Sequence, residues 1–216
     1  MGAQEFKLLK PLPAVPVELS AIADQLWQGR SFLNEEFTLG NLRQARRQQG
    51  FGILHLATHA DFRPGVSSYI QLWQDQQLTL KQLKALKLGQ DPPVELLVLS
   101  ACRTAFGDLE SELGFAGLAV LAGVKSALGS LWYVSDEGTL ALMTAFYDQL
   151  RRTPVKAEAL RQAQLAMLRG DVRLENGQLI TPSEQFPLTP TLASRGNRDL
   201  SHPFFGSAFT IVGNPW

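Results

Sequence analysis

Cysteine is the scarcest reactive residue in the chain, since its 216 residues include a single Cys, at position 102. One cysteine excludes an internal disulfide and any zinc or iron–sulfur site that needs several thiolates. A free thiol is best maintained in a reducing compartment, so we expect a cytoplasmic protein. The sequence also shows no signal peptide and no apolar stretch of the roughly 18 residues that a membrane span requires, so we expect no membrane association.

Neither positive nor negative charge is in excess, because Lys and Arg total 20 and Asp and Glu total 20. Nucleic-acid binding depends on a basic face that releases counterions from the phosphates, so we expect no nucleic-acid partner. The phosphate-binding patterns G-x-G-x-x-G and G-x-x-x-x-G-K-[ST] are missing as well. We therefore expect neither a nucleotide site nor another bound cofactor.

Histidine is also rare, with only His55, His59 and His202 in the chain. The His55-x-x-x-His59 spacing suits a metal ion on a helix, but on a strand the two residues lie roughly 13 Å apart, too far to chelate one ion. Position 56 is Leu, where a zinc protease carries Glu. The sequence thus predicts no metal site, and we interpret His55 as a core histidine.

Two segments lack the periodicity of helices or strands. Residues 6–16 (FKLLKPLPAVP) are rich in Pro, so we interpret residues 1–16 as an N-terminal linker and residues 17–216 as one domain. Residues 171–203 contain three clusters of turn-forming Pro or Gly, which predicts a surface insertion that is less ordered than the strands.

The remaining sequence alternates between strand and helix patterns. Strands are predicted at residues 51–57, 67–73, 94–101, 126–132 and 209–212. Helices are predicted at residues 17–28, 38–49, 79–89, 110–123, 136–150 and 154–168, with Thr38, Thr79 and Ser135 as N-caps. Continuous apolar strands alternating with helices indicate an α/β sandwich with a largely parallel central sheet flanked by helices.

His59 and Cys102 each follow a predicted buried strand, at its carboxyl end. In a parallel sheet these ends share one edge, which is where open α/β folds place their sites. A Cys–His pair is chemically meaningful, because thiolate is the attacking species and imidazole takes up the thiol proton near neutral pH. A lone Cys beside a buried strand is commonly structural, and this geometry does not by itself identify a reaction.

Five segments together resemble the CHAT family of caspase-like cysteine peptidases, which is related to separases and often follows tetratricopeptide repeats. The segments are HLATHADF (55–62), LVLSACRTAFG (97–107), LAGVKSALGSLWYVSDEGTLALMTAFYDQL (121–150), EALRQAQLAML (158–168) and HPFFGSAFTIVGNP (202–215). The resemblance runs from about residue 10 to the end, and the order and spacing of the motifs make it specific. It implies a caspase-like three-layer sandwich.

The resemblance also implies hydrolysis of peptide bonds by a His–Cys dyad, which makes the chain a cysteine endopeptidase domain. His59 matches the general base and acid, and Cys102 matches the nucleophile. The oxyanion donors of caspase-like peptidases match the backbone N–H groups of Cys102 and Ala60. Ala60 stands where these peptidases have Gly, and alanine resists the positive φ that glycine adopts. The alternative interpretation is a catalytically silent caspase-like scaffold that binds protein partners.

Trp132 and Asp136 belong to a segment that resembles the W-D-V-T-D motif of separases. In one interpretation Trp132 lines the cleft and Asp136 binds a basic residue that precedes the scissile bond. In the other, Trp132 is a core residue and Asp136 is a helix-start carboxylate favoured by the helix dipole. We expect a protein or peptide as substrate, and tetratricopeptide-repeat modules as partners in the full-length protein.

Overall fold

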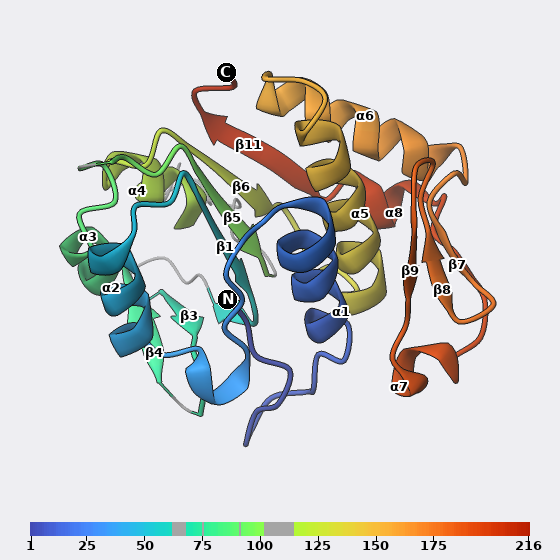
Figure 1. Cartoon of the computed structure of the whole chain (residues 1–216), viewed down its shortest axis with the longest axis horizontal. Helices are drawn as coiled ribbons and strands as arrows, with labels where there is room; N and C mark the ends of the chain where they lie inside the picture. Colours follow the sequence, from blue (N-terminus) through green and yellow to red (C-terminus); the bar gives the residue numbers. More distant parts are fainter. Residues whose placement is uncertain (62–67, 75, 91, 102–114) are drawn as a thin grey trace. The chain divides into compact units, whose positions relative to one another are not determined.

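A computed structural model describes residues 1–61, 68–74, 76–90, 92–101 and 115–216 (Figure 1). The chain divides into two compact units. Unit 1 comprises Met1–Pro11, Phe32–Tyr133 and Phe209–Pro215, and unit 2 comprises Leu12–Ser31, Val134–Ala208 and Trp216. Each unit contains a sheet and helices of its own, although neither is one continuous stretch of chain.

Unit 1 is built on a sheet whose described strands follow the order β1-β5-β6-β11. These strands are β1 (Ile53–Ala57), β5 (Leu96–Ser100), β6 (Ser126–Ser130) and β11 (Phe209–Gly213). β5 runs parallel to β1 and to β6, whereas β11 is antiparallel to β6. Every residue of β5 is buried, in agreement with the apolar run LLVL that precedes Ser100. The four strands predicted at 51–57, 94–101, 126–132 and 209–212 are confirmed.

Three helices of unit 1 pack on this sheet. They are α2 (Leu39–Gln48), α3 (Leu80–Ala85) and α4 (Phe115–Leu121). Thr38 caps α2 by accepting the Asn41 N–H at 3.1 Å, and Thr79 and Gln82 form a capping box at the start of α3, as predicted. α4 is part of the helix predicted at 110–123, of which residues 110–114 lie outside the described residues.

The helices and the sheet of unit 1 share one hydrophobic core, and Figure 1 shows α2, α3 and α4 together on one side of the sheet. Core side chains come from α2, α3, α4, β1 and β5: Leu42, Leu83, Ala116, Ala119, Leu54, Leu56, Leu97 and Leu99. Burial of such side chains is the main source of stability of an α/β layer structure. The predicted mixed α/β fold with a largely parallel central sheet flanked by helices is confirmed.

A second, smaller sheet follows β1 in the chain. It contains β2 (Ala60–Asp61), β3 (Tyr69–Gln71) and β4 (Gln77–Thr79), which pair in antiparallel order. The pattern at 67–73 predicted β3, but β2 and β4 were not predicted. Strands of two or three residues are too short to show an alternation of apolar and polar side chains.

The first residues of the chain, Met1–Ala3, belong to unit 1 and pair with β1. The Ala57 N–H donates to the Met1 carbonyl at 2.9 Å, and the Ala3 N–H donates to the Ala57 carbonyl at 3.1 Å. Gly2 bridges Ala57 on one side and Leu33 on the other. Met1 and Ala3 are buried in the core. These residues thus act as an edge strand that covers β1.

Unit 2 contains the two longest described helices, α5 (Asp136–Leu150) and α6 (Lys156–Leu168), which pack against each other. Ser135 caps α5 by accepting the Gly138 N–H at 2.9 Å, as predicted. The predicted helix at 17–28 is α1 (Val15–Ser20) followed by a π-helical stretch (Ala21–Leu26). Two short helices, α7 (Pro190–Ala193) and α8 (Pro203–Gly206), complete the helices described in this unit.

Residues 171–203, predicted as an irregular insertion, form an antiparallel sheet of order β10-β7-β8-β9 in unit 2. Its strands are β7 (Arg173–Glu175), β8 (Gln178–Ile180), β9 (Gln185–Pro187) and β10 (Arg198–Asp199). Asn176 and Gly177 both adopt positive φ, at 52° and 74°, and join β7 to β8. Asn-Gly is the preferred pair for such a two-residue hairpin turn, a signal that the sequence analysis missed. Buried Leu174, Leu179 and Phe186 anchor the sheet.

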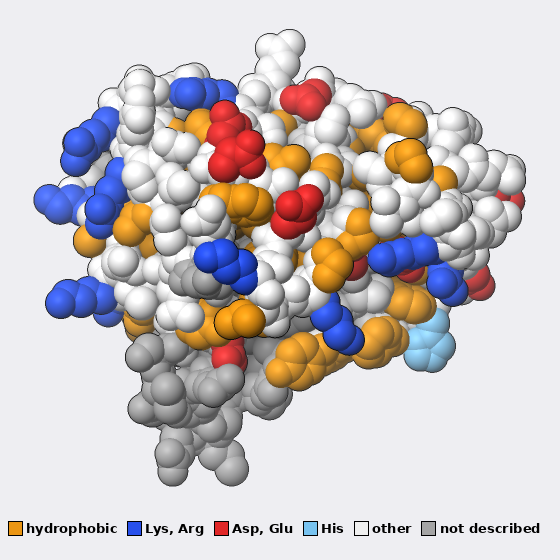
Figure 2. Space-filling model, turned by 90° about the horizontal axis from the view of Figure 1, so that it is seen from below, with side chains coloured by type: hydrophobic (Ala, Val, Ile, Leu, Met, Phe, Trp, Pro, Cys, Tyr) orange, Lys and Arg blue, Asp and Glu red, His pale blue; other side chains and the backbone are white. Residues whose placement is uncertain are grey.

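The surface carries side chains of both charges. Figure 2 shows basic, acidic and hydrophobic side chains interspersed on one face of the molecule, in keeping with equal numbers of acidic and basic residues in the chain. Within the part of the chain that the structure describes, no helix combines the length and the apolarity needed to cross a membrane.

Candidate active site

The carboxyl ends of β1 and β5 lie side by side in unit 1, because the two strands are parallel neighbours. Ile53 pairs with Leu96 and Ala57 pairs with Ser100, so each residue of β1 pairs with the one 43 positions later. The Thr58 N–H donates to the Ser100 carbonyl at 3.2 Å, so the contact between the two segments extends beyond β1. The next residue of this segment is His59.

Cys102 lies outside the described residues, but the chain immediately before it is described. Ala101 directly follows β5 and is buried, at 5% exposure. Its carbonyl accepts a hydrogen bond from the Ser130 hydroxyl at 2.6 Å, which ties the end of β5 to the end of β6. His59 and Cys102 are 43 positions apart, the same offset that relates β1 to β5.

The backbone of His59 is held by β3. The His59 carbonyl accepts the Gln71 N–H at 2.9 Å, and the Gln71 carbonyl accepts the buried Thr58 hydroxyl at 2.7 Å. The side-chain amide of Gln71 donates in turn to the carbonyls of Leu72 and Gln76, at 3.1 and 2.9 Å. Gln71 therefore clamps the segment that carries His59, a role the sequence analysis missed because no local pattern shows which strand pairs with residues 58–60.

The imidazole of His59 is half-buried and contacts the N-terminal part of the chain. Its Nε2 lies 2.8 Å from the Lys10 carbonyl oxygen. A carbonyl oxygen only accepts, so Nε2 carries a proton, and in the neutral ring Nδ1 is then the basic nitrogen. The Phe6 ring meets the imidazole edge to face, with the ring centroids 4.7 Å apart.

Ala60 lies in β2 opposite Ile70 of β3. Hydrogen-bonded pairs alternate with non-hydrogen-bonded pairs in an antiparallel ladder, and the neighbouring pair of His59 and Gln71 is hydrogen-bonded. The Ala60 N–H is therefore directed away from β3. Its backbone is extended, so alanine at this position does not need the positive φ that glycine adopts.

Trp132 and Asp136 belong to different units. Trp132 follows the carboxyl end of β6 in unit 1 and is half-buried. Asp136 is the first residue of α5 in unit 2, and its Oδ2 accepts the Ala14 N–H at 2.8 Å. Burial raises the pKa of the Asp136 carboxyl to about 7, and the negative charge of Glu18 adds to this effect. Unit 1 thus brings His59, Ala60 and Trp132 to the ends of its parallel strands, while the described contacts of Asp136 lie within unit 2.

The sequence model of the CHAT domain family matches residues 2–214. The chain belongs to the CHAT domain family. No match was found among curated proteins. The motifs quoted from the sequence and the parallel β1–β5 pair that precedes His59 and Cys102 are therefore features of a CHAT domain.

Solved structures show that this CHAT domain has a caspase-like fold. It resembles the crystal structure of the Arg-specific cysteine proteinase gingipain R with a TM-score of 0.60 and 13% sequence identity, over 99% of this chain and 45% of that chain. It also resembles a complex of Porphyromonas gingivalis RgpB pro- and mature domains, with a TM-score of 0.57 and 11% identity, over 96% of this chain and 43% of that chain. The CHAT domain therefore spans less than half the length of these structures.

Two further features bear on ligands of the CHAT domain. Among the residues that the structure describes, no group of three or more His, Cys, Asp or Glu side chains could hold a metal ion. His55, in the middle of β1, is buried as predicted.

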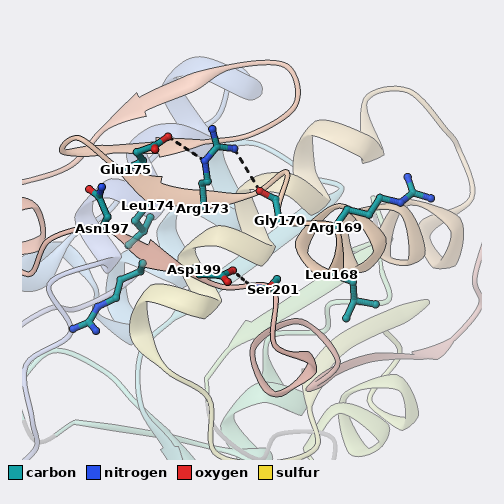
Figure 3. Close-up of a pocket in the computed structure, with 10 residues that line it drawn as sticks. Leu168, Arg169, Gly170, Arg173, Leu174, Glu175, Asn197, Asp199 and Ser201 are labelled. Atoms are coloured by element: carbon teal, nitrogen blue, oxygen red, sulfur yellow. Dashed lines mark hydrogen bonds and ion pairs between the residues drawn. The ribbon is translucent and has the colours of Figure 1, made fainter.

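A cavity of about 460 Å³ lies in unit 2, between the end of α6 and strands β7 and β10 (Figure 3). Arg173, in its lining, pairs with Glu175 at 3.1 Å. Figure 3 shows the guanidinium groups of Arg169 and Arg173 pointing in different directions, so they do not converge on one anion. The cavity contains none of the predicted site residues, and it does not contribute to the candidate active site.

Proposed function

We propose that this CHAT domain is a cysteine endopeptidase in which Cys102 is the nucleophile and His59 is the general base and acid. The observation that carries the proposal is the register of β1 and β5, whose offset of 43 residues equals the spacing of His59 and Cys102. A caspase-like fold and membership of the CHAT family support the same assignment.

In the acylation step, the imidazole of His59 takes the proton of the Cys102 thiol, and the thiolate attacks the carbonyl carbon of the scissile peptide bond. The tetrahedral oxyanion accepts hydrogen bonds from the N–H groups of Cys102 and Ala60. The imidazolium of His59 then returns its proton to the leaving nitrogen, which releases the amine and leaves a thioester. In the second step His59 deprotonates a water that attacks the thioester, and the acid product and the free thiol are released.

The substrate side chain we propose is a basic one, immediately before the scissile bond. The separase-like segment that ends at Asp136 supports this choice, since a carboxylate attracts Arg or Lys. One structural relative is described as an Arg-specific proteinase, which is consistent with it. Trp132 is proposed to line the cleft for this side chain, and tetratricopeptide-repeat modules are proposed as partners in the full-length protein.

Labelling with a peptide-derived electrophile tests the function, with intact-mass detection of the adduct. We expect one adduct on the wild-type chain and none on Cys102→Ala, which carries no other thiol. His59→Ala should react at least ~100-fold more slowly, because a positioned general base contributes a factor of this size. Probes with Arg, Ala or Glu before the reactive group measure the side-chain preference.

Equal adduct formation on the wild type and on Cys102→Ala would refute the assignment of the nucleophile. Absence of both labelling and cleavage would instead favour the catalytically silent scaffold. A specific observation makes this alternative worth testing, since the His59 ring is already in contact with Phe6 and Lys10.

A further inference from the structure

The segment Gln4–Lys10, which we call the N-terminal strap, connects the edge of β1 with the imidazole of His59. Before the strap, Ala3 is hydrogen-bonded to Ala57 and buried in the core of unit 1. At its start, the Gln4 N–H donates to the side chain of Asn34 at 3.0 Å. At its end, the Lys10 carbonyl accepts the His59 Nε2–H at 2.8 Å.

The strap engages His59 through two different kinds of contact. The Phe6 ring lies against the imidazole with a centroid distance of 4.7 Å and an interplanar angle of 62°. The Lys10 carbonyl accepts a hydrogen bond from the Nε2–H of the same imidazole. Pro11 supports this second contact, because a proline restricts the preceding residue to an extended backbone and so limits the direction of its carbonyl.

Most side chains of the strap are exposed to solvent. No side chain from Gln4 to Lys10, all of which the structure describes, is buried. Leu8 is 89% exposed and Leu9 is 40% exposed. Phe6 is the only apolar side chain of the strap that packs, half-buried, against the core of unit 1. A segment with so little buried apolar surface opens at lower free energy than the strands beneath it.

A segment in contact with His59 either positions the imidazole for catalysis or covers it, and the rigidity of the segment distinguishes these two roles. A group that positions a catalytic base must itself be held in place by packing, whereas Phe6 is the one apolar side chain by which the strap packs against the core. The strap also lies against the imidazole that exchanges protons in the proposed mechanism. Resting on the proposed peptidase function, we propose that the N-terminal strap is an autoinhibitory cover, which leaves His59 before a substrate is cleaved.

The test is Phe6→Ala, which removes the packed side chain of the strap. We expect the rate of Cys102 labelling and kcat/KM for a peptide substrate to rise about fivefold, the factor expected when one aromatic contact of about 1 kcal/mol is lost. Leu8→Ala is the matched control and should leave both rates unchanged, because Leu8 is 89% exposed in the same strap. Thermal unfolding of each variant establishes that the fold is retained.

A second readout does not depend on peptidase activity. Diethyl pyrocarbonate modifies accessible imidazoles, and peptide mass spectrometry separates His59 from the exposed His202, which is an internal reference. We expect His59 to be modified faster in Phe6→Ala than in the wild type, with His202 unchanged. Equal modification rates at His59 would overturn the autoinhibitory cover.

Different results would refute the autoinhibitory cover and the proposed peptidase function. If Phe6→Ala lowers the labelling rate or leaves it unchanged while the wild type is active, the cover is wrong and the peptidase stands. If neither protein labels at Cys102 but His59 becomes more accessible in Phe6→Ala, the strap covers His59 and the peptidase function is wrong.

Discussion

Two aspartates at opposite ends of helix α5 show how surroundings set the protonation of the same side chain. Asp136 accepts one backbone hydrogen bond, from Ala14, and burial raises its pKa to about 7. Burial also acts to raise the pKa of Asp148, but hydrogen bonds from Arg151 and Ser183 and the charge of Arg152 outweigh it, so the pKa lies below the ordinary value. Ionisation of Asp136 as the pH rises is therefore expected to lower the stability of the folded protein, whereas ionisation of Asp148 is expected to raise it.

Asp136→Asn should make the protein more stable at pH 8. The folded-state pKa of about 7 exceeds the unfolded value of 3.8, so the stability that Asp136 contributes is present below about pH 4 and is lost as the pH rises to about 7. Linkage gives an upper limit of about 4 kcal/mol for this loss. The neighbouring charges of Glu18 and Glu137 oppose ionisation, and that of Arg195 favours it. Urea unfolding of both proteins at pH 5 and pH 8 measures the difference.

The same variant tests the proposed substrate pocket. If Asp136 binds a basic side chain, Asp136→Asn should reduce cleavage after Arg or Lys much more than cleavage after Ala. An unchanged preference, combined with the expected gain in stability at pH 8, would assign Asp136 to the contact between α1 and α5 alone.

Asp148→Asn should destabilise the protein at neutral pH. The Asp148 side chain is 3% exposed, and it accepts hydrogen bonds from Arg151 at 2.7 Å and from Ser183 at 2.7 Å. Loss of these charge-assisted bonds should cost about 2 kcal/mol. Because the folded pKa is lowered, the difference should be present above about pH 4 and should shrink as the pH falls. Unfolding at pH 7 and pH 3 checks this, with the exposed Asp171→Asn as a control that changes little.

At the scale of elements, the antiparallel sheet over 173–199 is the largest departure from the predicted structure. Its strands have two or three residues each, so apolar periodicity cannot identify them. The Asn176-Gly177 turn and the single buried side chain in the middle of each of β7, β8 and β9 are the features that specify it. Ser183 further connects the β8–β9 turn to α5 through Asp148.

Phe186→Ala should therefore destabilise the protein, by about 3 kcal/mol, since Phe186 is 1% exposed. A solvated insertion would not respond in this way. Urea unfolding, with the exposed neighbour Gln185→Ala in the same strand as a control, distinguishes the two. A change of less than 0.5 kcal/mol, on the order of a surface substitution, would contradict the packed sheet.

At the scale of the whole molecule, both units are assembled from segments that are distant in the chain. β11, near the carboxyl end, pairs with β6, and Met1–Ala3 pairs with β1. Unit 1 thus includes residues from both ends of the sequence. Met1 and Ala3, at one of these ends, are part of the core of unit 1.

Ala3→Asp tests this assembly, because Ala3 is fully buried in the core of unit 1. A carboxylate placed there loses its hydration without gaining a partner, so we expect a loss of several kcal/mol or a failure to fold. Leu8→Asp, at a position 89% exposed, is the matched control and should unfold like the wild type. Equal stability of both variants, measured by thermal unfolding, would contradict the packing of Ala3 in this core.

The parallel strands, the helix caps and the CHAT family can all be recognised from local sequence patterns. A continuous apolar run such as LLVLS, or a capping box such as Thr79 and Gln82, is encoded within a few residues, and the CHAT motifs are likewise local. The order of His59 and Cys102 behind two such strands was sufficient to predict a candidate site. The short strands β2, β4 and β7–β10 were not predictable in this way, because their length gives no periodicity.

The surroundings of His59, by contrast, depend on contacts between segments that are distant in the chain. The clamp by Gln71, the edge pairing of Met1–Ala3 and the strap contacts of Phe6 and Lys10 join segments that lie 12 to more than 50 positions apart. Such contacts form because the core brings the segments together, and they leave no pattern in any one of them. Whether a histidine is open or covered is for this reason a property of the folded chain.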